Sequence, residues 1–205
     1  MEQLKEALHT WRWMRQKNMV NRHFALLAAR WLRLKLRYGK RFQTEGMCFI
    51  CPGVKLEIGS NATLRIGRWS WVGHDSKIRV HEGEVSIGSK TVMGQECTIS
   101  AYQHVSIGSE CIIADRVMLI DFDHGVVEVE RPIRRQGIYK RDVRVGSNVW
   151  MGYGSCILRG VSIGHNSVVG TNAVVTKDVP ENAVVGGVPA RVLRMREAPE
   201  HLRWE

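Results

Sequence analysis

The segment Asp121-Phe122-Asp123-His124-Gly125 combines the side chains that general acid–base chemistry uses. A neutral imidazole titrates near about pH 6.5, so His124 could accept a proton at physiological pH. A carboxylate bonded to the ring would fix its tautomer, but an extended segment points Asp121 and Asp123 away from His124. Such a bond therefore requires a turn, which Gly125 would permit. We predict a general base at His124, assisted by the two carboxylates.

The framework for this segment is a six-residue repeat. From about residue 58 onward an aliphatic residue recurs every six positions, often followed by glycine. This period fits neither an amphipathic helix nor an alternating strand, and it predicts an all-β solenoid whose three-sided coils stack as parallel strands. Glycine suits the corners, because a bulky side chain would crowd the turn there and because glycine tolerates positive φ. The clearest run is Val145-Gly146, Met151-Gly152, Ile157, Ile163-Gly164, Val169-Gly170 and Val175.

The repeat stops over residues 121–142, which are rich in charge. Long loops in compact folds are commonly functional, so we expect an inserted loop there with His124 at its mouth. Residues 46–190 would form the solenoid domain around this loop. Residues 1–45 would form a basic helical extension, and residues 191–205 a short charged tail or helix.

The extension holds almost all of the net charge. Residues 1–42 contain eleven lysines and arginines against two glutamates, which is +9 of the chain's +10. Helical spacing of leucine and tryptophan predicts two amphipathic helices, split near residues 18–21 and ending at Gly39. Capping of the first coil is the favoured role. Peripheral contact with an anionic membrane through residues 1–42 is the alternative, whereas no nucleic-acid-binding motif is present.

The cellular location follows from what the sequence lacks. No stretch reaches the roughly 18 apolar residues of a membrane span, and no secretory signal is evident, so we expect a cytoplasmic protein. Five cysteines, an odd number, fit a reducing compartment. Cys48 and Cys51 form a single C-x-x-C, for which we favour buried side chains over a zinc or redox site.

The C-terminal half carries a resemblance to a known family. The segments concerned are Val145-Gly146-Ser147-Asn148-Val149-Trp150-Met151-Gly152, Ala173-Val174-Val175-Thr176-Lys177-Asp178-Val179-Pro180 and Val185-Gly186-Gly187-Val188-Pro189-Ala190-Arg191-Val192. They resemble the hexapeptide-repeat O-acyltransferases, especially the branch of maltose and galactoside acetyltransferases and polysaccharide-modifying relatives. The resemblance is specific over about residues 105–195 and does not cover residues 1–45.

The resemblance implies a left-handed parallel β-helix that forms homotrimers, with active sites between neighbouring prisms. Acyl-CoA would be the co-substrate, either acetyl-CoA or succinyl-CoA, and no metal would be needed. His124 would deprotonate a sugar hydroxyl, which attacks the thioester. The main-chain N–H of Tyr153 would face the oxyanion. The positions that match CoA-binding residues of the family are Trp150, Gly152, Gly170, Thr171, Thr176, Lys177 and Arg191.

The acceptor does not follow from the resemblance. The Asn and Asp that galactoside-type members use are missing, and Gly94 and Tyr102 fall nearest to their positions. The inserted loop is cationic at Arg134 and Arg135, and we hypothesise that it contacts an anionic acceptor or a dicarboxylic acyl group. A solvated loop or a trimer contact is the alternative.

Other functions remain open at this point. An N-acyltransferase acting on a nucleotide-linked amino sugar would share the scaffold. A γ-type carbonic anhydrase would need three histidines on adjacent coils, whereas His104 and His124 stand alone and Leu119 occupies the position of a further ligand. A non-catalytic scaffold, in which His124 is incidental, is the alternative outside enzymes.

Overall fold

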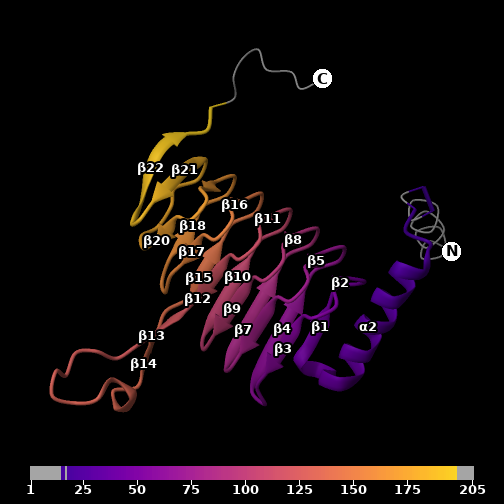
Figure 1. Ribbon diagram of the computed structural model, residues 1–205, viewed down its shortest axis with the longest axis horizontal. Coiled ribbons are helices and arrows are strands. Elements are labelled where there is room, and N and C mark those ends of the chain that lie inside the picture. The colour runs from indigo at the N-terminus through magenta and orange to yellow at the C-terminus, as the bar shows by residue number, and fades with distance from the viewer. Residues whose placement is uncertain (1–14, 17, 198–205) are drawn as a thin grey trace.

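The computed structural model describes residues 15, 16 and 18–197, and it consists of a helix followed by a three-sided parallel solenoid (Figure 1). Sheet A contains β1 (Phe42–Thr44), β4 (Ala62–Ile66), β7 (Gly83–Ile87), β10 (His104–Ile107), β15 (Val143–Val145) and β18 (Ser162–Ile163). Sheet B contains β2 (Phe49–Ile50), β5 (Trp71–Val72), β8 (Val92–Met93), β11 (Ile112–Ile113), β16 (Trp150–Met151), β19 (Val168–Val169), β21 (Ala183–Gly187) and β22 (Ala190–Met195). Sheet C contains β3 (Lys55–Ile58), β6 (Lys77–Val80), β9 (Thr98–Ala101), β12 (Met118–Ile120), β17 (Cys156–Ile157) and β20 (Val174–Val175).

The repeat positions stack in register from coil to coil. Val105 of β10 lies between Val85 and Val143, and Ile107 lies between Ile87 and Val145. All of these side chains are buried in one core that runs the length of the solenoid. The predicted parallel solenoid is therefore confirmed, and its left-handed winding stays a prediction from the resemblance.

The glycines after the repeat positions serve close packing rather than positive φ. A Cβ on Gly88 would lie 2.5 Å from the backbone carbon of Gly108 in the next coil, which no side chain tolerates. Positive φ occurs two residues later instead, for example at Lys90 (57°) and Glu110 (58°). The expected crowding at these corners is therefore confirmed, whereas the expectation of positive φ at these glycines was wrong.

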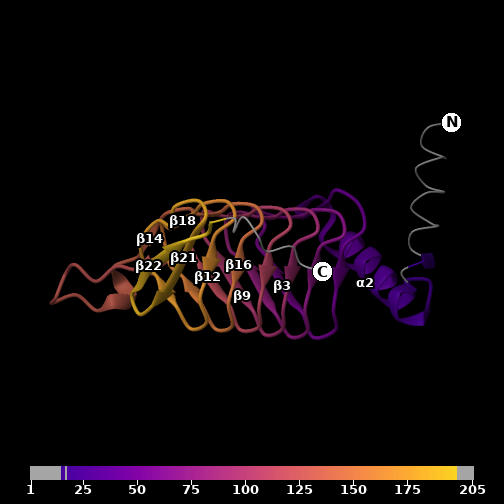
Figure 2. The same cartoon turned by 90° about the horizontal axis from the view of Figure 1, so that it is seen from above.

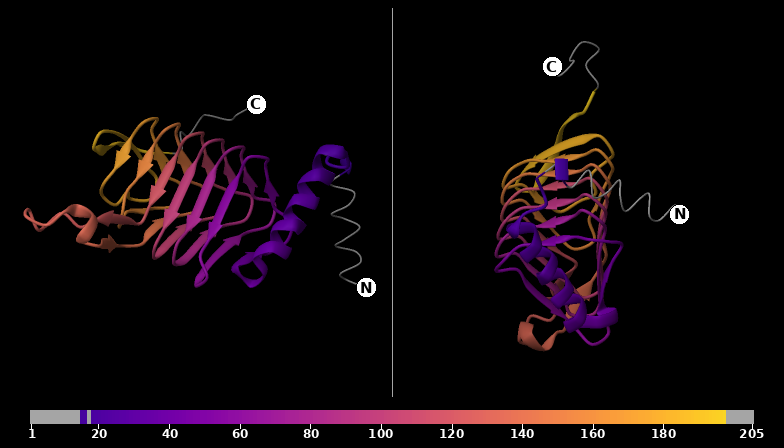
Figure 3. Two further views of the ribbon diagram at one scale, coloured as in Figure 1. Left: turned by 60° about the horizontal axis from the view of Figure 1, so that its bottom comes forward. Right: turned by 90° about the vertical axis from the view of Figure 1, so that its right-hand side faces the viewer.

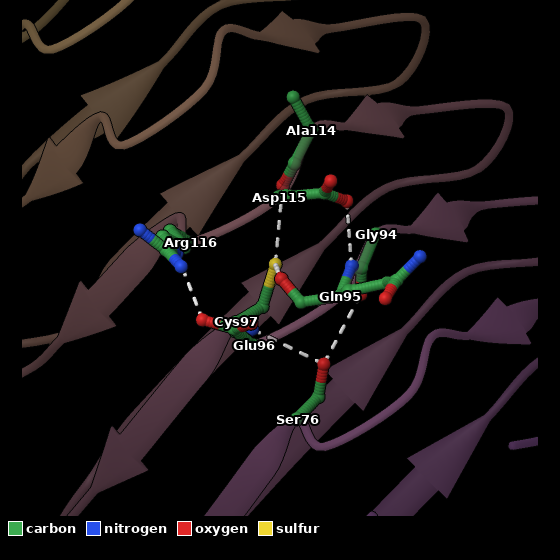
Figure 4. A network of polar contacts seen from close by, with 8 residues as sticks. All are labelled: Ser76, Gly94, Gln95, Glu96, Cys97, Ala114, Asp115 and Arg116. Atoms are coloured by element: carbon green, nitrogen blue, oxygen red, sulfur yellow. Dashed lines mark hydrogen bonds and ion pairs between the residues drawn. The ribbon is translucent and has the colours of Figure 1, made fainter. Parts of the chain in front are cut away.

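Polar side chains tie successive corners together, and Figure 4 shows one such network between sheets B and C. Ser76 Oγ donates to the Gly94 carbonyl and accepts from the Cys97 N–H, both at 3.1 Å. Cys97 Sγ donates to the Ala114 carbonyl at 3.1 Å, and Asp115 accepts from the Gln95 N–H at 2.7 Å. Each of these hydrogen bonds joins one coil to the next, so they hold neighbouring coils in register.

The cysteines pack mainly inside the solenoid. Cys48 and Cys51, the C-x-x-C pair, belong to the buried core, and both are free thiols. Burial raises the pKa of the Cys48 thiol to about 12 and that of Cys97 to about 11, because the thiolate is poorly solvated there. These thiols therefore stay protonated at neutral pH and act as small apolar side chains.

Helix α2 (Arg22–Tyr38) lies across the open end of the first coil (Figure 3). Asn21 caps its N-terminus by accepting from the Phe24 N–H at 3.1 Å, and the chain leaves it through Gly39. Leu27 is buried against the coil, and Arg30 donates to the Val54 carbonyl at 3.0 Å. The second expected helix and its capping role are confirmed, whereas the first expected helix falls largely outside the described residues.

The expected insertion is a hairpin that projects from the solenoid (Figure 2). Strand β13 (Phe122–His124) pairs antiparallel with β14 (Ile138–Lys140), and a short 3-10 turn, η2 (Ile133–Arg135), lies in the loop between them. The predicted C-terminal tail or helix was wrong over residues 191–195. These residues belong to β22, which folds back antiparallel on β21 and extends sheet B.

Core packing can be tested with two adjacent isoleucines of β11. Ile113 is 1% exposed, whereas Ile112 on the opposite face is 58% exposed. Ile113→Ala should lower the free energy of unfolding by about 2–4 kcal/mol, because it leaves a cavity in the core. Ile112→Ala should cost less than about 1 kcal/mol. Urea unfolding followed by circular dichroism measures both, and equal losses would contradict the assigned faces.

Candidate active site

His124 is the last residue of β13 and its side chain is exposed. Its backbone is paired with Ile138 of β14, so the strand pair holds it where the hairpin leaves the solenoid. The Phe122 ring meets the imidazole edge to face, with 6.4 Å between centroids. Among the described residues no hydrogen bond engages the imidazole, so both ring nitrogens are free to meet a substrate.

Asp121 anchors the root of the hairpin instead of assisting His124. Its fully buried carboxylate accepts two hydrogen bonds from the preceding coil, from the Tyr102 N–H at 2.8 Å and the Gln103 N–H at 2.7 Å. The Gln103 side chain also donates to Asp142, where the chain re-enters the solenoid. Both ends of the insertion are thereby tied to one bend of the coil beneath.

Asp123 makes the corresponding contact with the following coil. Its carboxylate accepts from Arg159 Nε at 2.7 Å, and Arg159 lies just after β17. The two carboxylates therefore face away from His124, as an extended strand dictates, and no turn brings them back. The expected carboxylate–imidazole bond is absent within the described protomer, and both acids serve to hold the strand that carries the base.

Tyr102 belongs to a row of rings beside the base. It stacks on His81 at 4.3 Å, meets the edge of Phe122 at 4.7 Å, and has Lys140 Nζ 5.3 Å from its centroid. The rings come from three successive coils and lead to His124 through Phe122. Sequence reasoning singled out Tyr102 but missed His81, whose position is defined only by the stacking of coils.

Most predicted CoA-binding residues lie on another part of the prism. Gly152 and Tyr153 follow β16, and Gly170 and Thr171 follow β19, so all four lie at the corner between sheets B and C. His124 follows β12 at the corner between sheets C and A, so sheet C separates the two groups. A single chain does not bring the base and the Tyr153 N–H together.

At the corner between sheets B and C, glycines leave the main chain uncovered, so a narrow ligand could lie directly on it. A Cβ on Gly152 would lie 2.6 Å from Thr171 N, so only glycine fits there. The Tyr153 N–H donates no hydrogen bond within the described part of the chain, and Tyr153 lies beneath the Arg116 guanidinium at 5.8 Å. Thr176 and Lys177 lie apart from this group, after β20 at the other corner.

A groove of about 590 Å³ runs over the outer face of sheet B. Its floor includes the side chains of Trp150, Val168 and Val184, and Trp150 is 54% exposed. Arg194 and Arg196 line the groove as well, and Arg191 lies on the same strand as Arg194. Arg194 was not predicted, because its place depends on β22, which was not expected.

The hairpin tip carries the two arginines proposed to meet an anion. Arg134 and Arg135 lie in η2 and are exposed, and within residues 18–197 neither forms an ion pair. Arg131 beside them pairs with Glu128 at 3.2 Å. The same described residues contain no cluster of three His, Cys, Asp or Glu side chains that could hold a metal ion.

Residues 142–177 match the family described as the hexapeptide repeat of succinyl-transferase. These residues carry the hexapeptide repeat, and the chain is similar to proteins named acetyltransferases. It is 38% identical to "Probable acetyltransferase Rv3034c" of Mycobacterium tuberculosis over 86% of this chain and 57% of that protein. It is 39% identical to the galactoside O-acetyltransferase of Escherichia coli strain K12 over 54% of this chain and 53% of that protein.

A solved structure named galactoside acetyltransferase in complex with coenzyme A has a TM-score of 0.56 and 32% identity, over 71% of this chain and 65% of that one. The resemblance inferred from the repeat is thereby confirmed. The chain spans a little over half the length of the two curated relatives.

The anchoring role of Asp121 can be tested with a matched aspartate. Asp121→Ala leaves two buried N–H groups without an acceptor, which should cost about 2–4 kcal/mol and loosen residues 121–142. Asp178→Ala removes an exposed carboxylate that accepts one N–H, from Ser162 at 2.8 Å, and should leave the hairpin unchanged. Hydrogen exchange followed by mass spectrometry compares the two. Unchanged protection of the hairpin in Asp121→Ala would contradict the anchoring role.

Proposed function

We propose that the protein is an acyl-CoA-dependent O-acyltransferase that acts on a hydroxyl of a sugar, oligosaccharide or polysaccharide precursor. The observation that carries this proposal is the exposed, unengaged His124 imidazole on a strand that is anchored to the coils on both sides. Similarity to proteins named acetyltransferases, one of them in complex with coenzyme A, supports the donor class. Either acetyl or succinyl groups would suit this chemistry.

His124 acts as the general base in the proposed reaction. The imidazole takes the proton from the acceptor hydroxyl as the oxygen attacks the thioester carbonyl. The Tyr153 N–H donates to the oxyanion of the tetrahedral intermediate. When the intermediate collapses, the C–S bond breaks, and the imidazolium returns its proton to the departing thiolate. The acyl group ends on the acceptor oxygen and the base is regenerated.

The residues at the corner between sheets B and C fit the donor. Gly152 and Gly170 leave the backbone open to the pantetheine arm, and Thr171 lies beside them. Trp150 offers an exposed apolar face over the sheet B groove. Arg191, with Lys177 and Thr176 from a neighbouring corner, would meet phosphates at the nucleotide end. Tyr102 would contact the acceptor from the ring row beside His124.

We further propose a homotrimer, because the base and the oxyanion donor lie at different corners of one prism. A neighbouring prism that places its corner between sheets B and C against His124 would complete the site. The basic segment 1–42 would serve a separate, peripheral contact with a membrane. We also propose a cytoplasmic location; no helix within the described residues is long and apolar enough to cross a membrane.

Replacement of the base tests the function. His124→Ala should lower acyl transfer at least about 1,000-fold while CoA binding is retained, because only proton transfer is removed. His104→Ala, an exposed histidine on β10, is the control and should keep full activity. Thiol release from several acyl-CoAs with sugars and amino sugars measures the rate, and calorimetry measures CoA binding.

Mass spectrometry of the product separates O-acylation from N-acylation. A protein without transfer in either form would be a scaffold, and an amide product would make it an N-acyltransferase. Full activity of His124→Ala would remove the imidazole from the mechanism.

The choice of acyl donor can be tested at the hairpin tip. If Arg134 meets the free carboxylate of succinyl-CoA, Arg134→Ala should lower kcat/KM for succinyl-CoA about tenfold and leave that for acetyl-CoA unchanged. Arg131→Ala, which removes a cation already paired with Glu128, serves as the control. An unchanged ratio of the two donors in Arg134→Ala would rule out this contact.

A further inference from the structure

Helix α2 has a second apolar face that the solenoid does not cover. Its inner face packs on the first coil through Leu27, with Trp31 and Leu34 beside it. On the opposite side Ala25, Ala29, Leu32 and Leu36 are all exposed, Leu32 at 52% and Leu36 at 78%. Their spacing of four, three and four residues places them in one line along the helix, here called the outer stripe.

Arginines border the outer stripe along one side. Arg22, Arg33 and Arg37 are exposed and follow the same helical period, and Leu26, which is 61% exposed, lies among them. A helix that only capped a coil would need one apolar face and would carry polar residues on the other. An apolar line edged by arginines is instead the pattern of helices that lie in a membrane interface.

A cationic groove adjoins this arginine row. It has a volume of about 640 Å³ between α2 and the first coil, and Arg30, Arg33, Arg37 and Lys55 line it. Glu57 also lines the groove, but its carboxylate is paired with Arg79 at 3.3 Å. Arg30 Nε is buried and has no hydrogen-bond partner. The groove therefore has an excess of positive charge, because its one carboxylate is already paired.

We propose that α2 binds an anionic lipid surface, with the outer stripe in the acyl region and phosphate headgroups at Arg33, Arg37 and the cationic groove. Charge complementarity favours this occupant, since residues 1–42 carry a net charge of +9. A second copy of the chain seated on the stripe would supply no anion to the adjoining cationic groove, whereas a phosphate headgroup would. This contact would place the acyltransferase at a membrane that presents its acceptor.

Vesicle sedimentation with the full chain tests the lipid contact. Wild type should bind vesicles of phosphatidylcholine and phosphatidylglycerol in a ratio of about 7 to 3, and should not bind phosphatidylcholine alone. Arg33→Gln/Arg37→Gln should bind roughly 30-fold more weakly. Leu32→Gln/Leu36→Gln should bind at least about tenfold more weakly, because the stripe no longer enters the acyl region.

Two controls keep the result specific. Lys90→Gln/Arg131→Gln removes two exposed, ion-paired cations from other parts of the surface and should bind like wild type. His124→Ala should also bind like wild type, so failure of lipid binding and failure of catalysis are distinguished.

Three results would overturn the proposal. They are an absence of wild-type binding to the anionic vesicles, full binding by the leucine variant, and equal weakening by the control pair. If Leu32→Gln/Leu36→Gln lowers the mass of the oligomer in light scattering while wild type ignores vesicles, the stripe is covered by another copy. If wild type ignores vesicles and the leucine variant keeps the oligomer mass of wild type, the stripe binds neither lipid nor a second copy, and the proposal is overturned.

Discussion

In-register stacking of parallel coils is the constraint on which the rest of the molecule depends. No single coil encloses a core, so each aliphatic position is buried only because the coils on both sides repeat it. The corners obey the same rule, since a Cβ on Gly88 would collide with the next coil. Side chains such as Ser76 and Cys97 form hydrogen bonds from one coil to the next at these corners. The position of every residue on the surface is thus set by its place in the repeat.

The hairpin uses this rigidity to hold a base away from the core. Asp121 binds two N–H groups of the coil before it, and Asp123 binds Arg159 of the coil after it. His124 lies next to both acids along the chain but uses neither. Orientation of the imidazole therefore comes from the strand that carries it.

Much of the fold could be predicted from the sequence, because burial in a solenoid has a fixed period. The insertion was visible for the same reason, as an interruption of that period, and Gly39 marked the end of α2. Side-chain contacts between coils could not be predicted from the sequence. Asp121 reaches Gln103 eighteen residues earlier, and Asp123 reaches Arg159 thirty-six residues later, so neither pair forms a local motif. Strand β22 was missed because nothing in its composition indicates pairing with β21.

The antiparallel return of β22 has a consequence for how copies of the solenoid meet. A stack of parallel coils that simply stopped would present open backbone donors and acceptors, on which the first coil of another molecule could continue the ladder. Sheet B instead ends in a reversed strand that carries Arg191 and Arg194, and α2 obstructs the opposite end. Continuation of the sheet B ladder from one molecule to the next is thereby disfavoured at both of its ends.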